Sequence, residues 1–195
     1  IKSNFSADII VMTGKISDYR YDEMIYMGAS DFVEKPFSPN EMVLRINRVL
    51  RERNLRKEAA NANEELKNSY IDSIHRLVMA AEYKDEDTGD HIIRIGEYCS
   101  LMAKKLNISK EFSEIIYHAA PMHDIGKIGI PDRILQKEGK LDDEEQRIMQ
   151  THTEMGTRII GEDDSELLKM ASQVAATHHE HWDGSGYPGG LAGED

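Results

Sequence analysis

Residues 123–132 read His123-Asp124-Ile125-Gly126-Lys127-Ile128-Gly129-Ile130-Pro131-Asp132. An imidazole and a carboxylate stand side by side at the start of this stretch. Lys127 follows Asp124 by three residues, so a helical turn would bring the two side chains to one face. Imidazole and carboxylate groups are ligands of Fe, Mn, Zn and Ni in proteins. The stretch therefore indicates a metal-binding segment.

Further candidate ligands lie on both sides of this segment. Asp87 and His91 are four residues apart, which puts them on one face of a helix. His152 stands inside a helical pattern, and His178 and His179 are adjacent. A site for two or three metal ions needs about seven or eight such ligands, with one carboxylate bridging. The succession of these units along one chain favours a shared metal site.

Two histidines and the cysteine are left outside this site. His75 and His118 stand alone in the sequence, where structural or surface histidines are the more common interpretation. Cys99 is the single cysteine, which excludes a disulfide framework and a Cys-based zinc finger.

The pattern around these ligands is helical almost throughout. The acidic run 142–145 is typical of a capped helix start, because carboxylates are favoured at the positive end of the helix dipole. No convincing strand is seen after residue 71, so this part is predicted to be all α. The expected helices are 91–106, 110–123, 142–160 and 166–181.

A longer motif narrows the function. Residues 85–91 and 123–132, together with the stretch below, resemble the HD-GYP subfamily of the HD superfamily of metal-dependent phosphohydrolases. The resemblance covers residues 71–195, and members of this subfamily hydrolyse cyclic di-GMP. The third stretch reads His178-His179-Glu180-His181-Trp182-Asp183-Gly184-Ser185-Gly186-Tyr187-Pro188-Gly189.

The resemblance implies roles for individual residues. Asp124 corresponds to the carboxylate that bridges metals, and Asp87 to an acidic residue that recruits a third metal in some members. Lys127 corresponds to a lysine that contacts the scissile phosphate, so Asp124 and Lys127 are the expected catalytic residues. The implied metal ligands are Asp87, His91, His123, Asp124, His152, His178 and His179. The implied substrate-binding residues are Lys127, Gly186, Tyr187 and Pro188, of which the last three form the loop that is also linked to docking of GGDEF-domain partners.

The implied cofactors are two or three divalent ions, Fe or Mn first, with Zn, Ni or Mg as alternatives. Such metals stabilise the charges of phosphodiester hydrolysis, and the expected product is pGpG, with further cleavage to GMP. The family continues beyond the GYP motif with a final Asp ligand and basic substrate-binding residues. The sequence ends at Asp195 and starts at Ile1, so a fragment with its C-terminal end missing is expected.

The N-terminal part, 1–54, shows a different pattern. Apolar segments at 8–14 and 31–34 predict strands, and helices are expected at 21–27 and after the turn at 38–40. This alternation predicts a parallel α/β unit.

The same residues resemble the C-terminal part of a response-regulator receiver domain, although any parallel α/β fragment is the alternative. The resemblance assigns Thr13 and Lys35 to the receiver switch. It also implies an upstream histidine kinase as a partner, and a phosphoacceptor Asp that lies upstream of this sequence.

The segment 41–83 connects the two parts. No Pro or Gly occurs from residue 41 to residue 87, which predicts one long helix. Apolar residues follow 4-3-4 spacings from Leu55 to Leu66 and from Tyr70 to Ala81. The segment therefore reads as a signalling helix that pairs with its copy in a homodimer, with a solvated linker helix as the alternative.

The charge of the chain excludes some partners. The 195 residues carry 24 Lys and Arg against 36 Asp and Glu, a net charge of −12. Such an acidic chain is not expected to bind DNA or an anionic membrane surface, and a cytoplasmic setting is expected. The leading hypothesis is a receiver-linked cyclic di-GMP phosphodiesterase. The alternatives are a catalytically silent module that binds a GGDEF partner or the nucleotide, and a hydrolase of another cyclic dinucleotide.

Overall fold

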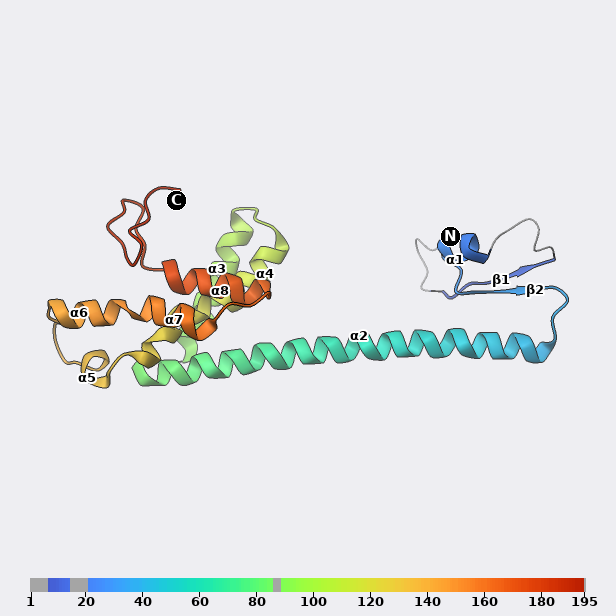
Figure 1. Ribbon diagram of the computed structural model, residues 1–195, viewed down its shortest axis with the longest axis horizontal. Helices are drawn as coiled ribbons and strands as arrows, with labels where there is room; N and C mark the ends of the chain where they lie inside the picture. The colour runs from blue at the N-terminus through green and yellow to red at the C-terminus, as the bar shows by residue number, and fades with distance from the viewer. Residues whose placement is uncertain (1–6, 15–20, 86–88, 195) are drawn as a thin grey trace. The chain divides into compact units, whose positions relative to one another are not determined.

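A computed structural model describes residues 7–14, 21–85 and 89–194 of the chain. The chain divides into two compact units, Ile1–Asn68 and Ser69–Asp195. Each unit is described by itself. Figure 1 gives the element labels used below.

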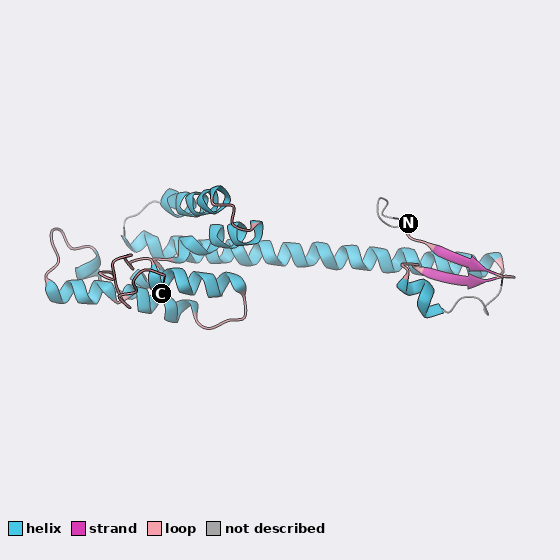
Figure 2. Cartoon of the chain, turned by 90° about the horizontal axis from the view of Figure 1, so that it is seen from above, coloured by secondary structure: helices cyan, strands magenta, loops and turns pink. Residues whose placement is uncertain are grey.

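The first unit is a small parallel α/β unit. Strand β1 (Ile10–Thr13) pairs in parallel with β2 (Asp31–Glu34), with Ile10 opposite Asp31 and Thr13 opposite Glu34. Helix α1 (Tyr21–Tyr26) lies between them in the chain. The predicted alternation of strands and helices is present. Strand β1 and helix α1 are shorter than the predicted segments 8–14 and 21–27. Among the described residues, strands occur only in this unit (Figure 2).

A buried carboxylate fastens β2 to the start of helix α2 (Pro39–Glu82). Asp31 is fully buried, and it pairs with Arg45 at 3.4 Å and with Arg48 at 2.6 Å. Arg45 also donates to the carbonyl of Phe32 at 2.7 Å. Burial of a carboxylate is costly unless a cation and hydrogen bonds compensate it, so these pairs hold the strand against the helix.

Helix α2 is continuous through the segment that lacks Pro and Gly. Every residue from Leu50 to Tyr70 is exposed within this chain. This includes Leu55 and Leu66, with exposed fractions of 54% and 69%. The apolar positions from Leu55 to Leu66 therefore find no partner within the described part of the chain, whereas Ile74 and Ala81 pack in the core of the second unit.

The second unit is helical, which confirms the predicted all-α fold. Its core is built where the last turns of α2 meet α3, α4, the 3₁₀ turns and α8; the fully buried members include Val78, Ala119 and Ala171. The elements after α2 are η2 (Tyr83–Asp85), α3 (Gly89–Lys105), α4 (Lys110–Ala119), η3 (Ala120–Met122), η4 (Ile125–Gly129), α5 (Asp132–Leu135), α6 (Asp143–Gln150), α7 (His152–Ile160) and α8 (Glu166–Thr177).

Local sequence signals explain the helix starts. Asp142 accepts hydrogen bonds from the amides of Glu144 and Glu145, and Glu145 accepts one in return from the amide of Asp142. This capping box starts α6, as the acidic run predicted. Ser109 caps α4 by accepting from the amide of Phe112.

Three expected helices are shorter or interrupted in the structure. The helix predicted for 110–123 ends at Ala119, because Pro121 has no amide to continue it and the chain tightens into 3₁₀ turns. The predicted helix 142–160 is interrupted at Thr151, whose amide and hydroxyl both donate to the carbonyl of Ile148. The predicted helix 166–181 ends at Thr177. Each of these ends lies within a few residues of a predicted ligand.

Candidate metal centre

Four predicted ligands converge in the second unit. Each of Asp124, His152, His178 and His179 offers a ligand atom, and these atoms all lie within 4.8 Å of one another. Asp124 lies between η3 and η4, and His152 is the first residue of α7 rather than an interior helical residue. His178 and His179 directly follow α8. Three helix ends therefore meet at this cluster.

The imidazole rings are oriented by their own helices. Nδ1 of His123 donates to the carbonyl of Ala120 at 3.0 Å, and Nδ1 of His152 donates to that of Met149 at 2.7 Å. Nδ1 of His178 lies 3.1 Å from the carbonyl of Val174. Because a carbonyl can only accept, these contacts place a proton on Nδ1 and leave Nε2 as the atom that can bind a metal. Metal-binding histidines show this arrangement.

The free lone pairs face one carboxylate oxygen. Nε2 of His152 and Nε2 of His178 lie 3.2 Å from each other and 3.3 Å from Oδ1 of Asp124. This Oδ1 is buried and accepts no hydrogen bond from the described residues. Electron-rich atoms at such distances repel one another unless a cation lies among them. The buried, unsatisfied oxygen and the N/O donor set therefore fit a divalent metal ion.

The pKa shifts of the clustered side chains also indicate a site that favours a positive charge. Burial raises the pKa of Asp124, but the interactions of its carboxylate with the imidazoles of His123, His152 and His178 outweigh burial and hold the pKa well below its usual range. Burial lowers the pKa of His123, and its hydrogen bond and attraction to Asp124 reverse this into a net increase. Burial, followed by repulsion from His178 and His152, lowers the pKa of His179 to about 4.

These pKa shifts predict proton-linked metal binding. A raised pKa means that His123 of the metal-free protein keeps a proton at a pH where an ordinary histidine has lost it, and a metal must displace that proton. We expect the apparent affinity for Mn²⁺ to weaken as the pH falls from about 8 to about 6, by about tenfold per unit for each displaced proton. Calorimetry in buffers of different ionisation enthalpy counts the released protons. A pH-independent affinity without proton release would contradict this.

The second oxygen of Asp124 faces the remaining predicted residues. Nε2 of His123 and Nζ of Lys127 each lie 3.0 Å from Oδ2. The ring of His91, from α3, lies 6.5 Å from that of His123 between centroids. The carboxylate thus presents Oδ1 to one set of imidazoles and Oδ2 to His123 and Lys127. Asp87 lies outside the described residues.

The predicted substrate-binding loop lies against the cluster. Tyr187 stacks on His179, with 4.6 Å between ring centroids and 19° between planes. Its amide donates to the carbonyl of His179 at 3.2 Å. A Cβ at Gly186 would come within 2.5 Å of main-chain atoms of three residues, His179 to His181. Glycine is therefore required for this close approach. Pro188 is exposed.

Glu180 is a loop residue that the sequence reasoning missed. Its Oε1 accepts from the amide of Gly189 at 2.6 Å, and its Oε2 accepts from the amide of Leu191 at 3.0 Å. One carboxylate therefore closes the loop that presents Tyr187. The available signal was an acidic residue directly before a glycine-rich stretch, whose free amides need acceptors.

Substitution of this carboxylate is expected to weaken substrate binding. The change Glu180→Gln replaces one acceptor oxygen by an NH₂ group, which breaks one of the two charge-assisted bonds. Such bonds are worth about 1.5–3 kcal/mol, so we expect KM to rise about tenfold and kcat to change less. Steady-state kinetics measure both. The control Glu154→Gln, at an exposed residue of α7, should leave KM unchanged, and equal effects of the two variants would contradict the role of Glu180.

The two predicted switch residues lie in the first unit. Thr13 is the last residue of β1, and Lys35 follows the last residue of β2. The amide of Lys35 donates to the carbonyl of Thr13 at 2.7 Å. The two residues therefore share one edge of the sheet.

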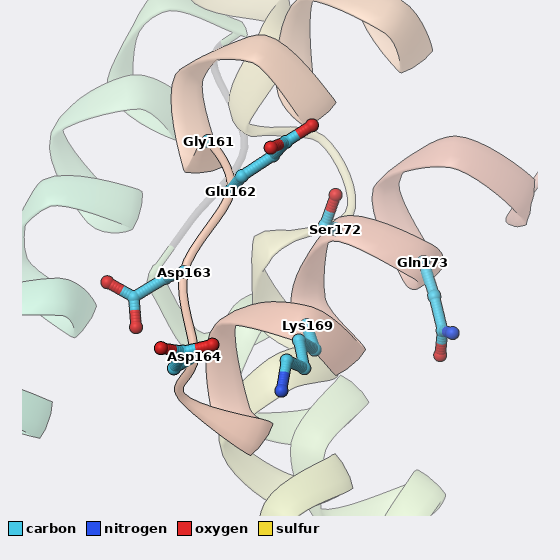
Figure 3. Close-up of a pocket in the computed structure, with 7 residues that line it drawn as sticks. All are labelled: Gly161, Glu162, Asp163, Asp164, Lys169, Ser172 and Gln173. Atoms are coloured by element: carbon cyan, nitrogen blue, oxygen red, sulfur yellow. The ribbon is translucent and has the colours of Figure 1, made fainter.

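Other polar clusters do not resemble the metal centre. Nδ1 of His118 lies 3.4 Å from Nε2 of His75, so these two histidines face each other. An acidic cavity of about 550 Å³ lies at the connection between α7 and α8. Figure 3 shows Glu162 and Asp163 pointing to opposite sides of this loop, so they do not converge on a common point. An acidic lining is also unfavourable for an anionic dinucleotide.

Within the described ranges, no helix combines the length and the apolar character that a membrane crossing requires.

The sequence is similar to several known proteins and to one protein family. A cyclic di-GMP phosphodiesterase of Thermotoga maritima is 37% identical over 96% of this chain and 56% of its own length. The cyclic di-GMP phosphodiesterase response regulator RpfG of Xanthomonas campestris is 34% identical over 86% of this chain and 47% of its own length. A 3'3'-cGAMP-specific phosphodiesterase of Vibrio cholerae is 41% identical over 71% of this chain and 26% of its own length.

This chain therefore spans about half or less of the length of these relatives. The family model of the HD domain matches residues 54–195. This range contains every described member of the His/Asp cluster and its loop. The chain belongs to the HD domain family.

Proposed function

We propose that this chain is the HD-GYP-type catalytic part of a metal-dependent phosphodiesterase that hydrolyses cyclic di-GMP. The carrying observation is the convergence of two Nδ1-protonated imidazoles, His152 and His178, on the unsatisfied Oδ1 of Asp124. This arrangement supports a divalent cation, and the adjacent ammonium of Lys127 supports an anionic substrate.

The proposed cofactors are two or three divalent ions, Fe or Mn before Zn, Ni or Mg. Asp124 would be the residue shared by these ions, since its Oδ1 faces His152 and His178 and its Oδ2 faces His123. When bound, such ions supply Lewis acidity and activate water for attack on a phosphodiester. The full proposed ligand set is Asp87, His91, His123, Asp124, His152, His178 and His179.

The chain's own residues position the substrate. Lys127 contributes a positive charge close to the carboxylate, where negative charge develops on the phosphate during hydrolysis. The loop at Gly186, Tyr187 and Pro188 binds the dinucleotide beside the cluster. Tyr187 is held in place by its stack on His179. The product is pGpG, which can be cut further to GMP.

The relatives support cyclic di-GMP over another dinucleotide. Those from Thermotoga and Xanthomonas match both units of this chain and act by name on cyclic di-GMP. The Vibrio relative, named for 3'3'-cGAMP, matches a smaller share but with higher identity. Hydrolysis of 3'3'-cGAMP is therefore the second candidate activity.

The test is a substrate panel with the full chain, reconstituted anaerobically with Fe²⁺ or Mn²⁺. We expect cyclic di-GMP to be hydrolysed with a higher kcat/KM than 3'3'-cGAMP. The reverse order would make the chain a 3'3'-cGAMP phosphodiesterase. Binding of the nucleotide without turnover would support the silent signalling module instead.

Assembly is part of the same proposal. The exposed apolar positions of α2 pair with those of a second copy, so the protein forms a homodimer. The proposed location of this homodimer is the cytoplasm. The first unit receives a signal from a histidine kinase through a receiver that Thr13 and Lys35 help to form. A GGDEF-domain protein is a further partner of the loop at Gly186–Tyr187–Pro188.

A further inference from the structure

Lys84 makes an unusual set of contacts directly after α2. Its ammonium donates to the carbonyls of Ile128 at 3.0 Å and Ile130 at 2.7 Å, and it lies 3.1 Å from Oδ1 of Asp132. An ammonium has three N–H donors, so all three find acceptors on one segment. Gln136 donates to the carbonyl of Lys84 at 3.1 Å. A lysine on a solvated face has no reason to bind main-chain carbonyls in this way.

The bound carbonyls belong to the segment that carries the site. The amide of Ile130 donates to the carbonyl of Lys127 at 3.0 Å, and the amide of Lys127 donates to the carbonyl of Asp124 at 2.9 Å. A continuous series of hydrogen bonds therefore runs from Nζ of Lys84, through two 3₁₀ turns, to Asp124. Ile130 is fully buried, which fixes the far end of the series in the core.

We propose that Lys84 is a positioning residue for the segment 124–130, and that through it the end of α2 sets the place of Lys127 beside Asp124. Oδ1 of Asp124 faces His152 and His178 of the His/Asp cluster, whereas Lys127 has its main-chain support from the turns that Lys84 binds. A loss of Lys84 is therefore expected to displace Lys127 more than the His/Asp cluster. This role rests on the proposed function only in its kinetic consequence.

The first test concerns structure and needs neither metal nor substrate. In the metal-free full chain, Lys84→Met should speed amide hydrogen exchange at Lys127 and Ile130 by about tenfold or more, because the hydrogen bonds of the turns protect those two amides from exchange. Exchange in α8 should be unchanged. Lys84→Arg, which can still donate to two carbonyls, should restore slow exchange. Lys110→Met is the matched control, since Lys110 is exposed and, among the described residues, forms an ion pair with Glu114 alone.

The second test concerns kinetics. We expect Lys84→Met to lower kcat about 10- to 100-fold, which is the usual loss of activity when a residue that supports the ligands of a site from outside is replaced. KM and the metal content should be nearly unchanged. Lys84→Arg should recover most of kcat. A rise of KM at constant kcat, a loss of bound metal, or failure of the arginine variant to recover would overturn the positioning role. If Lys84→Met does not fold, Lys84→Gln, which keeps two N–H donors without charge, replaces it under the same criteria.

The two tests separate this proposal from the proposed function. Faster exchange confined to 124–130 in a chain that hydrolyses no cyclic dinucleotide would refute the function and support the role of Lys84. An active chain whose exchange and kcat are unaffected by Lys84→Met would refute the role of Lys84 and leave the function standing.

Discussion

Replacement of Asp124 by asparagine is expected to reduce hydrolysis of the cyclic dinucleotide by about 10³-fold or more. The amide has nearly the same shape as the carboxylate but carries no charge. Its NH₂ group cannot accept from Lys127 or ligate a cation, so one face of the cluster loses its acceptor. Steady-state hydrolysis and metal analysis of the purified full chain measure the effect.

A thermal-shift experiment measures metal binding separately from hydrolysis. A metal at about 100 times its Kd stabilises a protein by about 2.7 kcal/mol, so Mn²⁺ should raise the melting temperature of the wild type. The Asp124→Asn variant should show no such rise. The control is Asp143→Asn, at an exposed residue in the first turn of α6. Retention of both metal and turnover by Asp124→Asn would remove the basis of the proposed site.

The change Gly126→Ala is expected to have the largest effect on stability. A Cβ at this position would lie 1.9 Å from the carbonyl oxygen of His152 and 2.4 Å from the amide nitrogen of Gly156. Both atoms are main-chain atoms, so η4 and α7 must move apart. We expect a loss of about 3 kcal/mol, or roughly 10 °C in the melting temperature. Thermal unfolding of the metal-free chain measures it.

A neighbouring glycine provides the matched comparison. At Gly129, in the same 3₁₀ segment, an added Cβ meets only the flexible side chain of Met155. That side chain can rotate away, so Gly129→Ala should cost less than about 1 kcal/mol. Gly126→Ala should also weaken Mn²⁺ binding, because His152 and Asp124 lie on the two segments that it separates. Equal melting temperatures for the two variants would show that the close approach is not required.

The ligand types could be predicted from sequence, because imidazole and carboxylate chemistry is visible in the residues themselves. The fold class could also be predicted, from the alternation before residue 40 and the helical pattern after it. The helix ends could not. The sequence predicts a helix up to His123 and uninterrupted helices through His152 and His178. In the structure α4 ends at Ala119, α7 begins at His152 and α8 ends at Thr177, directly before His178.

The physical reason is that the ends are fixed by tertiary contacts. Helical periodicity continues through Thr151, yet the close packing of Gly126 against the main chain at His152 and Gly156 holds a turn there. Local rules tend to fail at sites where function imposes geometry. Lys84 and Glu180 were missed for a related reason. Each is an ordinary charged residue in sequence, and only the folded chain shows that it binds two main-chain groups.

The Nδ1 contacts of the histidines have a consequence for how the centre forms. Each acceptor carbonyl lies three or four residues before its own histidine, so once tertiary packing has fixed a turn, a carbonyl of that same turn orients the ring. The conformational freedom of these side chains is then lost as each turn forms, and not when the ligands meet. The centre then assembles when the three turns that carry His123, His152 and His178 pack together with their imidazole rings already oriented.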